Sequence, residues 1–267
     1  MELAGSWFNG VAADSVSIQS RGLAYGDGVF ETVLCCGNKP QHWERHVARL
    51  REGCARLQLD GPADLDAQVA TAMQATSTAF SVLKIMVIRA EVAAGYAFSS
   101  NDSDTIISVA AYQATPTVAL NVGIASQCLA VNPQLAGIKH LSRIEQTMAA
   151  AEAQREALDD LLMLDTHNNI IEAVSSNVFF KLSGQWCTPA LNNAGVAGVM
   201  RAYFLEEFLS ANNIDCKVCD IPLTALQTCE SAFVTNSLKG PRPIGVLNGV
   251  TLNTEALSFL GNIKNNA

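Results

Sequence analysis

The chain carries at residues 137–146 the sequence Gly137-Ile138-Lys139-His140-Leu141-Ser142-Arg143-Ile144-Glu145-Gln146. A β-rich run, Val118–Leu129, precedes this stretch, and a helical pattern over Leu141–Leu158 begins within it. Lys139 therefore lies at the predicted junction of a strand and a helix. Such a junction suits a buried, reactive amine, although a single lysine before a helix is more often an ordinary surface residue.

The predicted helix gives this junction its support. Ile144, Met148 and Ala151 recur on one of its faces, so we expect that face to pack against a core. Lys139 is then one of the few lysines in the chain that are held in a fixed place.

Composition narrows the class of protein. Hydrophobic residues make up 49% of the 267 residues and charged residues only 16%, which is typical of a globular chain with full cores. The net charge of −8 and the absence of a basic run argue against nucleic-acid binding, but they leave an anionic small molecule open as substrate. We find no apolar run of about 20 residues and no signal pattern in MELAGSWFNG, so we expect a cytoplasmic protein that does not contact a membrane.

Eight cysteines raise the question of a metal or redox site. Cys216 and Cys219 have CxxC spacing, but no second CxxC or nearby pair of histidines completes a zinc site. We predict two thiols on a strand and no metal; whether they are ever oxidised is left open. The other cysteines lie in apolar contexts and are predicted to be small core residues of a reduced compartment: Cys35, Cys36, Cys54, Cys128, Cys187 and Cys229.

The first part of the chain predicts an α+β domain over residues 1–114. Strands are expected over Val29–Cys36, Val82–Arg89 and Thr105–Tyr112, with helices over Glu44–Leu57 and Asp64–Thr78. Arg21–Gly28 contains three glycines around one tyrosine and is predicted to be a loop. Residues 115–117 are predicted to be a linker.

Residues 118–267 predict a second, larger domain. Several short strands follow one another with polar turns between them, which indicates a barrel-like or strongly curved sheet with helices outside. A glycine-rich turn, Gly195–Gly198, leads into a helix predicted over Arg201–Asn212.

Four features of the chain match the needs of one ligand, pyridoxal 5′-phosphate. Its aldehyde needs an amine, for which Lys139 is the candidate, and its ring nitrogen needs a carboxylate partner, for which Glu172 is the candidate. Its phosphate needs N–H donors at the start of a helix and an arginine. The candidate phosphate donors are Gly198, Val199, Met200, Ser175, Asn236 and Ser237.

Taken in order, these residues resemble the fold-type IV pyridoxal-phosphate enzymes over nearly the whole chain. That family includes 4-amino-4-deoxychorismate lyases, branched-chain aminotransferases and D-amino-acid aminotransferases. The resemblance is to the lyases in particular, and it rests on four sequence blocks: Arg21-Gly22-Leu23-Ala24-Tyr25-Gly26-Asp27-Gly28-Val29-Phe30-Glu31-Thr32, the block around Lys139, Glu172-Ala173-Val174-Ser175-Ser176-Asn177 and Gly195-Val196-Ala197-Gly198-Val199-Met200-Arg201.

This resemblance implies a D-amino-acid aminotransferase-like fold of two domains, a smaller α/β domain and a larger barrel-like domain with the cofactor lysine, assembled as a homodimer. It implies that Lys139 binds the cofactor covalently, that Glu172 contacts the pyridine nitrogen and that Arg49 binds the phosphate. Tyr25, Thr32 and Arg89 are the candidate substrate-binding residues.

One position departs from the pattern of the lyases. Members of that group often carry an arginine just before a Gly-Tyr pair, where this chain has Ala94 before Gly95 and Tyr96. The same positions argue against a D-amino-acid aminotransferase. Recognition of the substrate carboxylates is thus left open, with Arg89 or a residue of the partner subunit as substitutes.

The resemblance implies a lyase that converts 4-amino-4-deoxychorismate to 4-aminobenzoate and pyruvate in folate biosynthesis. The alternative on the same fold is an aminotransferase acting on a branched-chain amino acid, a D-amino acid or an amine, because one fold hosts both chemistries. A non-catalytic binding protein is disfavoured, because packing alone gives no reason for a charged residue at Lys139 or Glu172.

Overall fold

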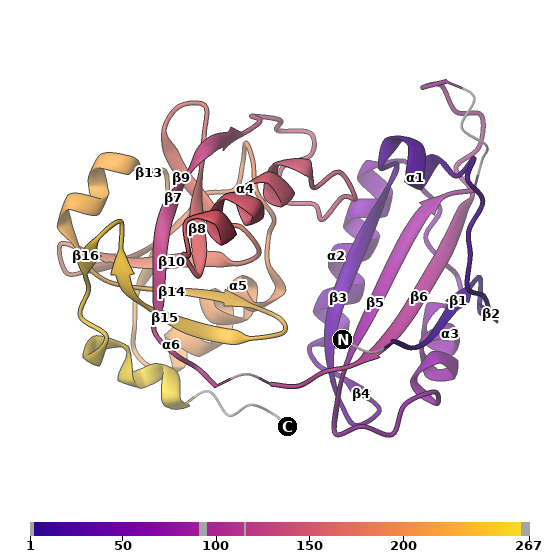
Figure 1. Cartoon of the computed structure of the whole chain (residues 1–267), viewed down its shortest axis with the longest axis horizontal. Helices are drawn as coiled ribbons and strands as arrows, with labels where there is room; N and C mark the ends of the chain where they lie inside the picture. The colour runs from indigo at the N-terminus through magenta and orange to yellow at the C-terminus, as the bar shows by residue number, and fades with distance from the viewer. Residues whose placement is uncertain (1–2, 91–94, 115, 263–267) are drawn as a thin grey trace. The chain divides into compact units, whose positions relative to one another are not determined.

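The computed structural model describes residues 3–90, 95–114 and 116–262 (Figure 1). It divides into two compact units, one made of Met1–Ala114 with Ile138–Ser142 and one made of Thr115–Gly137 with Arg143–Ala267. The division falls after Ala114, where the sequence predicts the first domain to end. The expectation that the larger domain carries Lys139 is wrong, because Ile138–Ser142 packs with the first unit.

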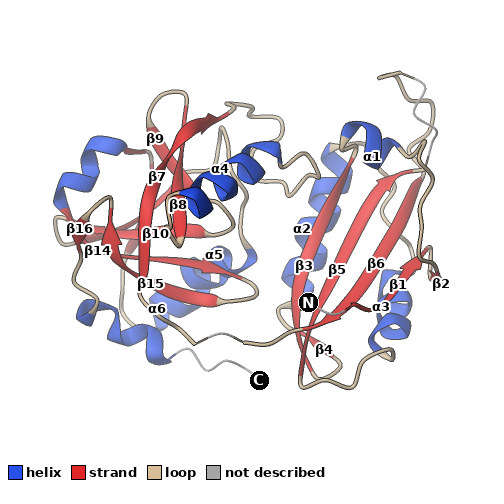
Figure 2. Ribbon diagram, in the orientation of Figure 1, coloured by secondary structure: helices blue, strands red, loops and turns tan. Residues whose placement is uncertain are grey.

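The first unit is a six-stranded antiparallel sheet in the order β2-β1-β6-β5-β3-β4, with two of its helices, α2 and α3, on one face (Figure 2). Its strands are β1 (Leu3–Phe8), β2 (Val11–Ala12), β3 (Gly28–Cys36), β4 (Lys39–Pro40), β5 (Phe80–Arg89) and β6 (Ser103–Ala111). Its helices are α1 (Arg21–Tyr25), α2 (Trp43–Arg56) and α3 (Leu65–Met73).

Strand β3 shows why this sheet has two different faces. Successive side chains of a strand point to opposite faces, and in β3 the residues Val29, Glu31, Val33 and Cys35 are buried while those between them are half-buried. The buried set joins apolar residues of α2 and α3 in one core. The other face of β3 begins with Phe30.

The segment Arg21–Tyr25 forms the short helix α1, so the prediction of a loop there is wrong. The helix ends at Gly26, which adopts the left-handed conformation (φ 65°) that glycine allows without strain. A Cβ at Gly26 would also collide with the Ser142 side chain. Gly22 lies within the helix and Gly26 and Gly28 follow it, and the helix begins at a buried arginine, Arg21, which the sequence pattern did not identify.

The second unit contains one ten-stranded mixed sheet. Its strands are β7 (Leu120–Leu129), β8 (Asp160–Asp165), β9 (Asn169–Ala173), β10 (Asn177–Leu182), β11 (Gln185–Pro189), β12 (Cys216–Cys219), β13 (Ile221–Pro222), β14 (Cys229–Asn236), β15 (Gly240–Leu247) and β16 (Val250–Thr251). Its helices are α4 (Ile144–Arg155), α5 (Val199–Tyr203), the π-helix η1 (Phe204–Phe208), α6 (Leu209–Ala211) and the 3₁₀ helices η2 (Leu223–Thr228) and η3 (Glu255–Asn262).

This sheet is strongly curved, as the succession of short strands predicts. Its order is β12-β11-β10-β14-β15-β7-β8-β9-β13, and β16 pairs with β15. In Figure 2 the strand β7 runs across the direction of β14 and β15. The apolar inner face of the sheet encloses a core that includes Phe180, Val234 and Ile244. The two-domain α+β architecture expected from the sequence is thus confirmed.

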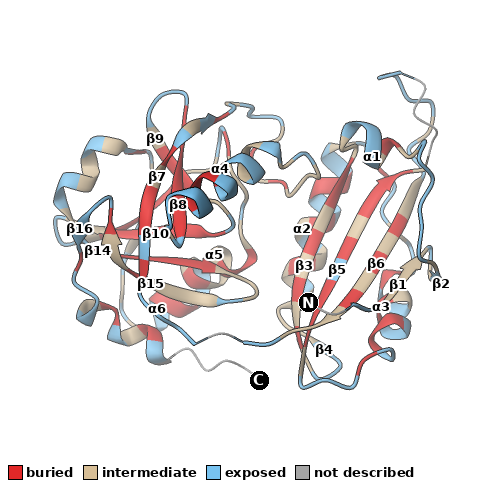
Figure 3. Ribbon diagram, in the orientation of Figure 1, coloured by how far each residue is buried: buried red, intermediate tan, exposed pale blue. Residues whose placement is uncertain are grey.

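Helix α4 packs through a different face from the one predicted. Ile144 and Met148 are 67% and 55% exposed, and the buried residues are Ala149, Glu152 and Ala153. Figure 3 shows that much of α4 is exposed. The small alanines allow the helix to lie close to β7 and β8, while Glu152 accepts hydrogen bonds from the backbone and hydroxyl of Ser126. The apolar spacing in the sequence therefore marks the exposed side of this helix.

No helix among residues 3–90, 95–114 and 116–262 combines the length and the apolar character needed to cross a membrane.

Candidate active site

Lys139 is fixed by the main chain on both sides of it. Its carbonyl oxygen accepts a hydrogen bond of 2.9 Å from the Phe30 N–H, and the Leu141 N–H donates one of 2.9 Å to the Gly28 carbonyl. His140 forms an isolated antiparallel bridge with Val29. Residues 139–141 thus extend the sheet of the first unit along the start of β3, which gives the lysine a defined position.

The Lys139 side chain lies over an aromatic ring that a second lysine shares. Its Nζ atom is 4.2 Å from the centroid of the Phe30 ring, and the Nζ atom of Lys84 is 5.6 Å from the same centroid. Thr32 faces the same side of β3 as Phe30 and pairs in register with Lys84 of β5. This face therefore gathers two amines and a hydroxyl around one ring.

Sequence reasoning missed Lys84, although a signal was present. It is an exposed lysine between Leu83 and Ile85, both fully buried, on a strand whose register follows from the hairpin-like order of the sheet. Because side chains alternate along a strand, a lysine between two apolar residues is expected on the face opposite the core.

Arg49 binds a carboxylate of its own unit. Its Nε and Nη2 atoms donate hydrogen bonds of 2.8 and 2.6 Å to the two oxygens of Glu31, and His46 Nδ1 lies 2.6 Å from Glu31 Oε2. Burial alone would raise the pKa of Glu31, but the charge and hydrogen bonds of Arg49, together with those of His46, hold that pKa below its ordinary value. Glu31 is therefore ionised at neutral pH.

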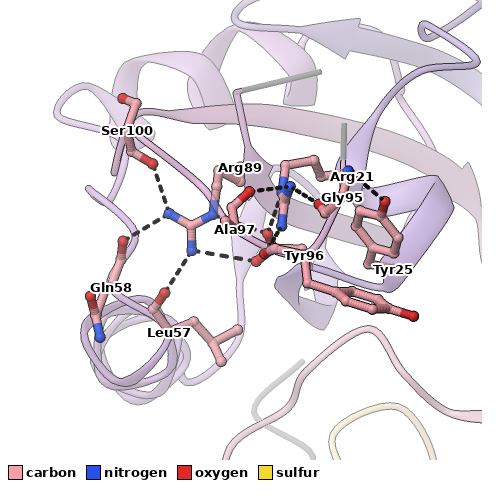
Figure 4. A network of polar contacts seen from close by, with 10 residues as sticks. Arg21, Tyr25, Leu57, Gln58, Arg89, Gly95, Tyr96, Ala97 and Ser100 are labelled. Atoms are coloured by element: carbon pink, nitrogen blue, oxygen red, sulfur yellow. Dashed lines mark hydrogen bonds and ion pairs between the residues drawn. The ribbon is translucent and has the colours of Figure 1, made fainter. Parts of the chain in front are cut away.

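Arg89 is a structural residue in this geometry. It is 2% exposed, and its guanidinium donates to Asp27 and to the carbonyls of Leu57, Gln58 and Ser100 at 2.8–3.1 Å (Figure 4). These bonds use all three nitrogens. The expectation that Arg89 pairs with a substrate carboxylate has no support in these contacts.

A second buried arginine shares the same carboxylate. Arg21 Nε donates to Asp27 at 2.8 Å, and its two terminal nitrogens donate to the carbonyls of Gly95, Tyr96 and Ala97 (Figure 4). Asp27 therefore bridges two arginines that together hold the loop of residues 95–100.

Tyr25 lies beside this loop. Its hydroxyl accepts a hydrogen bond of 3.2 Å from the Gly95 N–H, and its ring packs at 5.4 Å from that of Tyr96. Its role toward substrate stays a prediction. Ala94, at which the sequence departs from the lyase pattern, lies outside the described residues.

In the second unit, Glu172 is a buried and well-held carboxylate. It is 4% exposed on β9, and its Oε2 atom accepts a hydrogen bond of 2.8 Å from the Val196 N–H. Its Oε1 atom accepts a bond of 3.3 Å from Gln146 on α4. A carboxylate so fixed can act as partner to a protonated ring nitrogen.

The helix that begins at Val199 starts at a tightly packed glycine. A Cβ on Gly198 would collide with Asn177 Oδ1, and Asn177 in turn donates to the Val196 carbonyl at 2.9 Å. The helical segment continues through α5, η1 and α6, and its Phe204 packs at a tilt on Phe233 of β14, which stacks on Phe179 of β10. The first N–H groups of a helix have no partner within it, so this start offers donors to an anion.

Polar turns gather close to this helix start. The Asn236 amide donates to the Ser175 carbonyl and the Ser176 hydroxyl, and Asn236 Oδ1 accepts the Leu238 N–H. Thr235 pairs with Asn177, and its hydroxyl is buried without a hydrogen-bond partner among the described residues. An orphaned donor beside a helix start fits a site that an anionic group completes.

The expected site residues are divided between the two units. The first unit holds Lys139, Arg49, Thr32 and Tyr25, and the second unit holds Glu172, Ser175, Gly198, Val199, Met200, Asn236 and Ser237. An amine, a buried carboxylate, an arginine and a helix start are the kinds of group that pyridoxal 5′-phosphate requires, so each unit, taken by itself, carries residues that suit a part of this cofactor.

Cys216 and Cys219 are free thiols on β12, as predicted. Within residues 3–90, 95–114 and 116–262 no group of three His, Cys, Asp or Glu side chains is arranged to hold a metal ion. Burial raises the pKa of the Cys216 thiol to about 12. The prediction that the other cysteines are core residues is confirmed for Cys35, Cys54 and Cys187 and wrong for the exposed Cys128, while Cys36 and Cys229 are half-buried.

The chain is similar to known proteins over nearly its whole length. The chain is 32% identical over 244 residues to an aminodeoxychorismate lyase of Vibrio harveyi, which covers 89% of each chain. Its fold matches the crystal structure of the 4-amino-4-deoxychorismate lyase from Pseudomonas aeruginosa with a TM-score of 0.89, 33% identity and 98% of each chain covered. A branched-chain aminotransferase from Thermoproteus uzoniensis shares the fold at a TM-score of 0.86 and 18% identity, over 98% of this chain and 96% of its own.

A family match extends over most of the chain. Residues 28–247 match the amino-transferase class IV family, and this range includes Lys139, Arg49 and Glu172. Enzymes of this family use pyridoxal 5′-phosphate, which is also the cofactor of this chain. The sequence match and the shared two-domain fold lead to the same conclusion: the chain belongs to the amino-transferase class IV family of fold-type IV enzymes.

Proposed function

We propose that this chain is a lyase that converts 4-amino-4-deoxychorismate to 4-aminobenzoate and pyruvate, a reaction that supplies folate biosynthesis. The observation that carries the proposal is the near full-length similarity to two lyases at 32% and 33% identity. The ordered Lys139 segment at the start of β3 supports it.

In this proposal each group of side chains holds a different part of the cofactor. Lys139 binds the aldehyde carbon, and the ionised Glu172 keeps the pyridine nitrogen protonated. Arg49 and the polar groups of the second unit bind the phosphate: Ser175, Gly198, Val199, Met200, Asn236 and Ser237. The cofactor supplies an electron sink for charge that develops on the carbon bearing the substrate amine.

Lys139 is the proposed base of the reaction. With its amine free, Lys139 would take the proton from the carbon that bears the substrate amine. The neighbouring C–O bond to the enolpyruvyl group then breaks, and the leaving enol takes up a proton to become pyruvate. The ring that remains is aromatic, which makes the step strongly favourable.

Lys84 is the proposed partner of a substrate carboxylate, in place of Arg89. The substrate carries two carboxylates, and Lys84 is an exposed cation that shares the Phe30 ring with Lys139. Thr32, adjacent to Lys84 on the same face, adds a hydroxyl donor. This assignment explains how a chain with alanine at position 94 can recognise a dianion.

The test is to incubate the purified, cofactor-loaded protein with 4-amino-4-deoxychorismate and no keto acid, while 4-aminobenzoate and pyruvate are measured together. Equal amounts of both products are expected. An inactive but fully loaded protein would contradict the lyase assignment and favour the aminotransferase alternative. A screen of amino donors with a keto-acid acceptor would then identify the substrate.

A further inference from the structure

Glu31 is a carboxylate placed inside the core of the first unit. Its neighbours on the same face of β3, Val29 and Val33, are 1% and 0% exposed, and Glu31 itself is 1% exposed. Transfer of a charge from water to such a place costs free energy unless the charge is paired. The buried charge of Glu31 therefore depends on the side chains that pair with it.

Those partners come from one side of α2. His46 and Arg49 are three residues apart, and residues at this spacing lie on the same side of a helix. Arg49 contacts Glu31 through two parallel hydrogen bonds, one to each carboxylate oxygen, while His46 Nδ1 lies against Oε2. The two oxygens of Glu31 are thus fixed from two directions, and with them the plane of the guanidinium.

A buried ion pair adds little net stability to a fold, because desolvation of both charges offsets their attraction. It does fix geometry, because a two-point contact leaves the guanidinium no rotation about its own axis. Glu31 occupies two of the five N–H donors that a guanidinium carries in one plane. The remaining donors therefore keep a set direction.

We propose that Glu31 is a positioning residue for Arg49, which it orients toward the phosphate of the cofactor, with His46 holding Glu31 in turn. This inference rests on the proposed assignment of Arg49 to the phosphate. It adds that the affinity for the phosphate depends on a residue that does not touch it.

Two effects of Glu31 on phosphate affinity oppose one another. Its negative charge repels an anion, whereas its hold on Arg49 prepares a binding group in advance. If repulsion were the larger effect, Glu31→Gln would tighten phosphate binding. If orientation is larger, Glu31→Gln and Glu31→Asp both weaken it, since the first loses one acceptor and the second keeps the charge but is too short to reach.

The experiment compares two ligands that differ only in the phosphate. Apo-protein is titrated with pyridoxal 5′-phosphate and with pyridoxal, and binding is followed by absorbance of the bound chromophore. The Kd for pyridoxal divided by the Kd for pyridoxal 5′-phosphate reports the contribution of the phosphate, and a lower ratio means weaker phosphate binding. We expect Glu31→Gln and Glu31→Asp to lower this ratio by about tenfold, the effect of losing one charge-assisted hydrogen bond, with pyridoxal affinity unchanged.

Two controls separate the possible failures. Glu152→Gln replaces another buried glutamate, one that binds Ser126 in the second unit, and should leave the ratio unchanged. Arg49→Ala should lower the ratio at least as far as the Glu31 variants. A normal ratio in Arg49→Ala would refute the proposed role of Arg49 itself, whereas a low ratio there with a normal or raised ratio in the Glu31 variants would overturn only the inference about Glu31.

Unchanged pyridoxal binding also shows that a variant is folded and that Lys139 is reactive. If circular dichroism shows that both Glu31 variants are unfolded, His46→Leu decides the matter. This change removes the contact to Glu31 Oε2 and leaves both charges of the pair in place. A fall in the ratio is then expected, and an unchanged ratio would overturn the proposal.

Discussion

At the scale of single residues, Lys139 carries the strongest expectation. Replacement by alanine removes the amine that binds the cofactor and acts as base, so turnover should fall by about 10²-fold or more. The circular dichroism spectrum should not change, because the contacts that fix this segment are made by its backbone. Steady-state formation of 4-aminobenzoate measures the effect, and normal turnover would remove the central assignment.

Lys84 should affect substrate binding more than chemistry. In Lys84→Ala the proposed contact to a substrate carboxylate is lost, so we expect KM for the dianionic substrate to rise by about tenfold with little change in kcat. Lys39, an exposed lysine on β4, gives a matched control in Lys39→Ala. Equal kinetics of the Lys84 variant and this control would exclude Lys84 from the substrate site.

The buried pair of Glu31 and Arg49 gives a prediction about acid stability. Because the pKa of Glu31 is lowered from 4.5 in the folded protein, its ionised form stabilises the fold above that pH, and this stabilisation is lost as the pH falls through the lowered pKa. Glu31→Gln cannot titrate. The difference in Tm between wild type and this variant should therefore be constant near neutral pH and shrink below 4.5; a difference that does not depend on pH would contradict the ionised state.

At the scale of elements, the loop of residues 95–100 depends on Asp27. In Asp27→Asn two buried arginines lose their counter-charge, which should destabilise the first unit by about 3 kcal/mol. Thermal unfolding measures this, with the exposed Asp14→Asn as control. If the two variants unfold at the same temperature, the arginines are held by their carbonyl contacts alone.

The elements also show where sequence patterns are informative. The strands were predictable because alternation and turns repeat along them, as in β3 and β5. Helix α4 was predicted in place but with the wrong face, because its buried side consists of alanines and a hydrogen-bonded glutamate that apolar spacing does not detect. The helix α1 was missed because its anchor is a buried arginine.

At the scale of the whole molecule, the resemblance and the fold agree over nearly the full chain, so the family and the fold could be predicted from the sequence, while the roles of the site residues stay predictions. The sequence could not predict which side chains and carbonyl groups each charged residue contacts. Arg89 and Lys84 are both basic residues of β5, and only the three-dimensional contacts distinguish the arginine that holds a loop from the lysine that is exposed.

The family resemblance also predicts that two chains associate. Light scattering on the eluted protein should then give a mass of twice 28.4 kDa. A mass of 28.4 kDa at micromolar concentration, with full activity, would show that one chain is sufficient.

Two adjacent residues of strand β3 make different contacts on opposite faces of the sheet. The Phe30 ring lies beneath Lys139, and the Glu31 carboxylate binds Arg49. Both contacts therefore depend on the register of the strand. One extra residue inserted before Phe30 would move the aromatic ring into the core and the carboxylate to the outer face, so that both contacts would be lost together. Substitutions can tune this strand, but a single insertion cannot be accommodated.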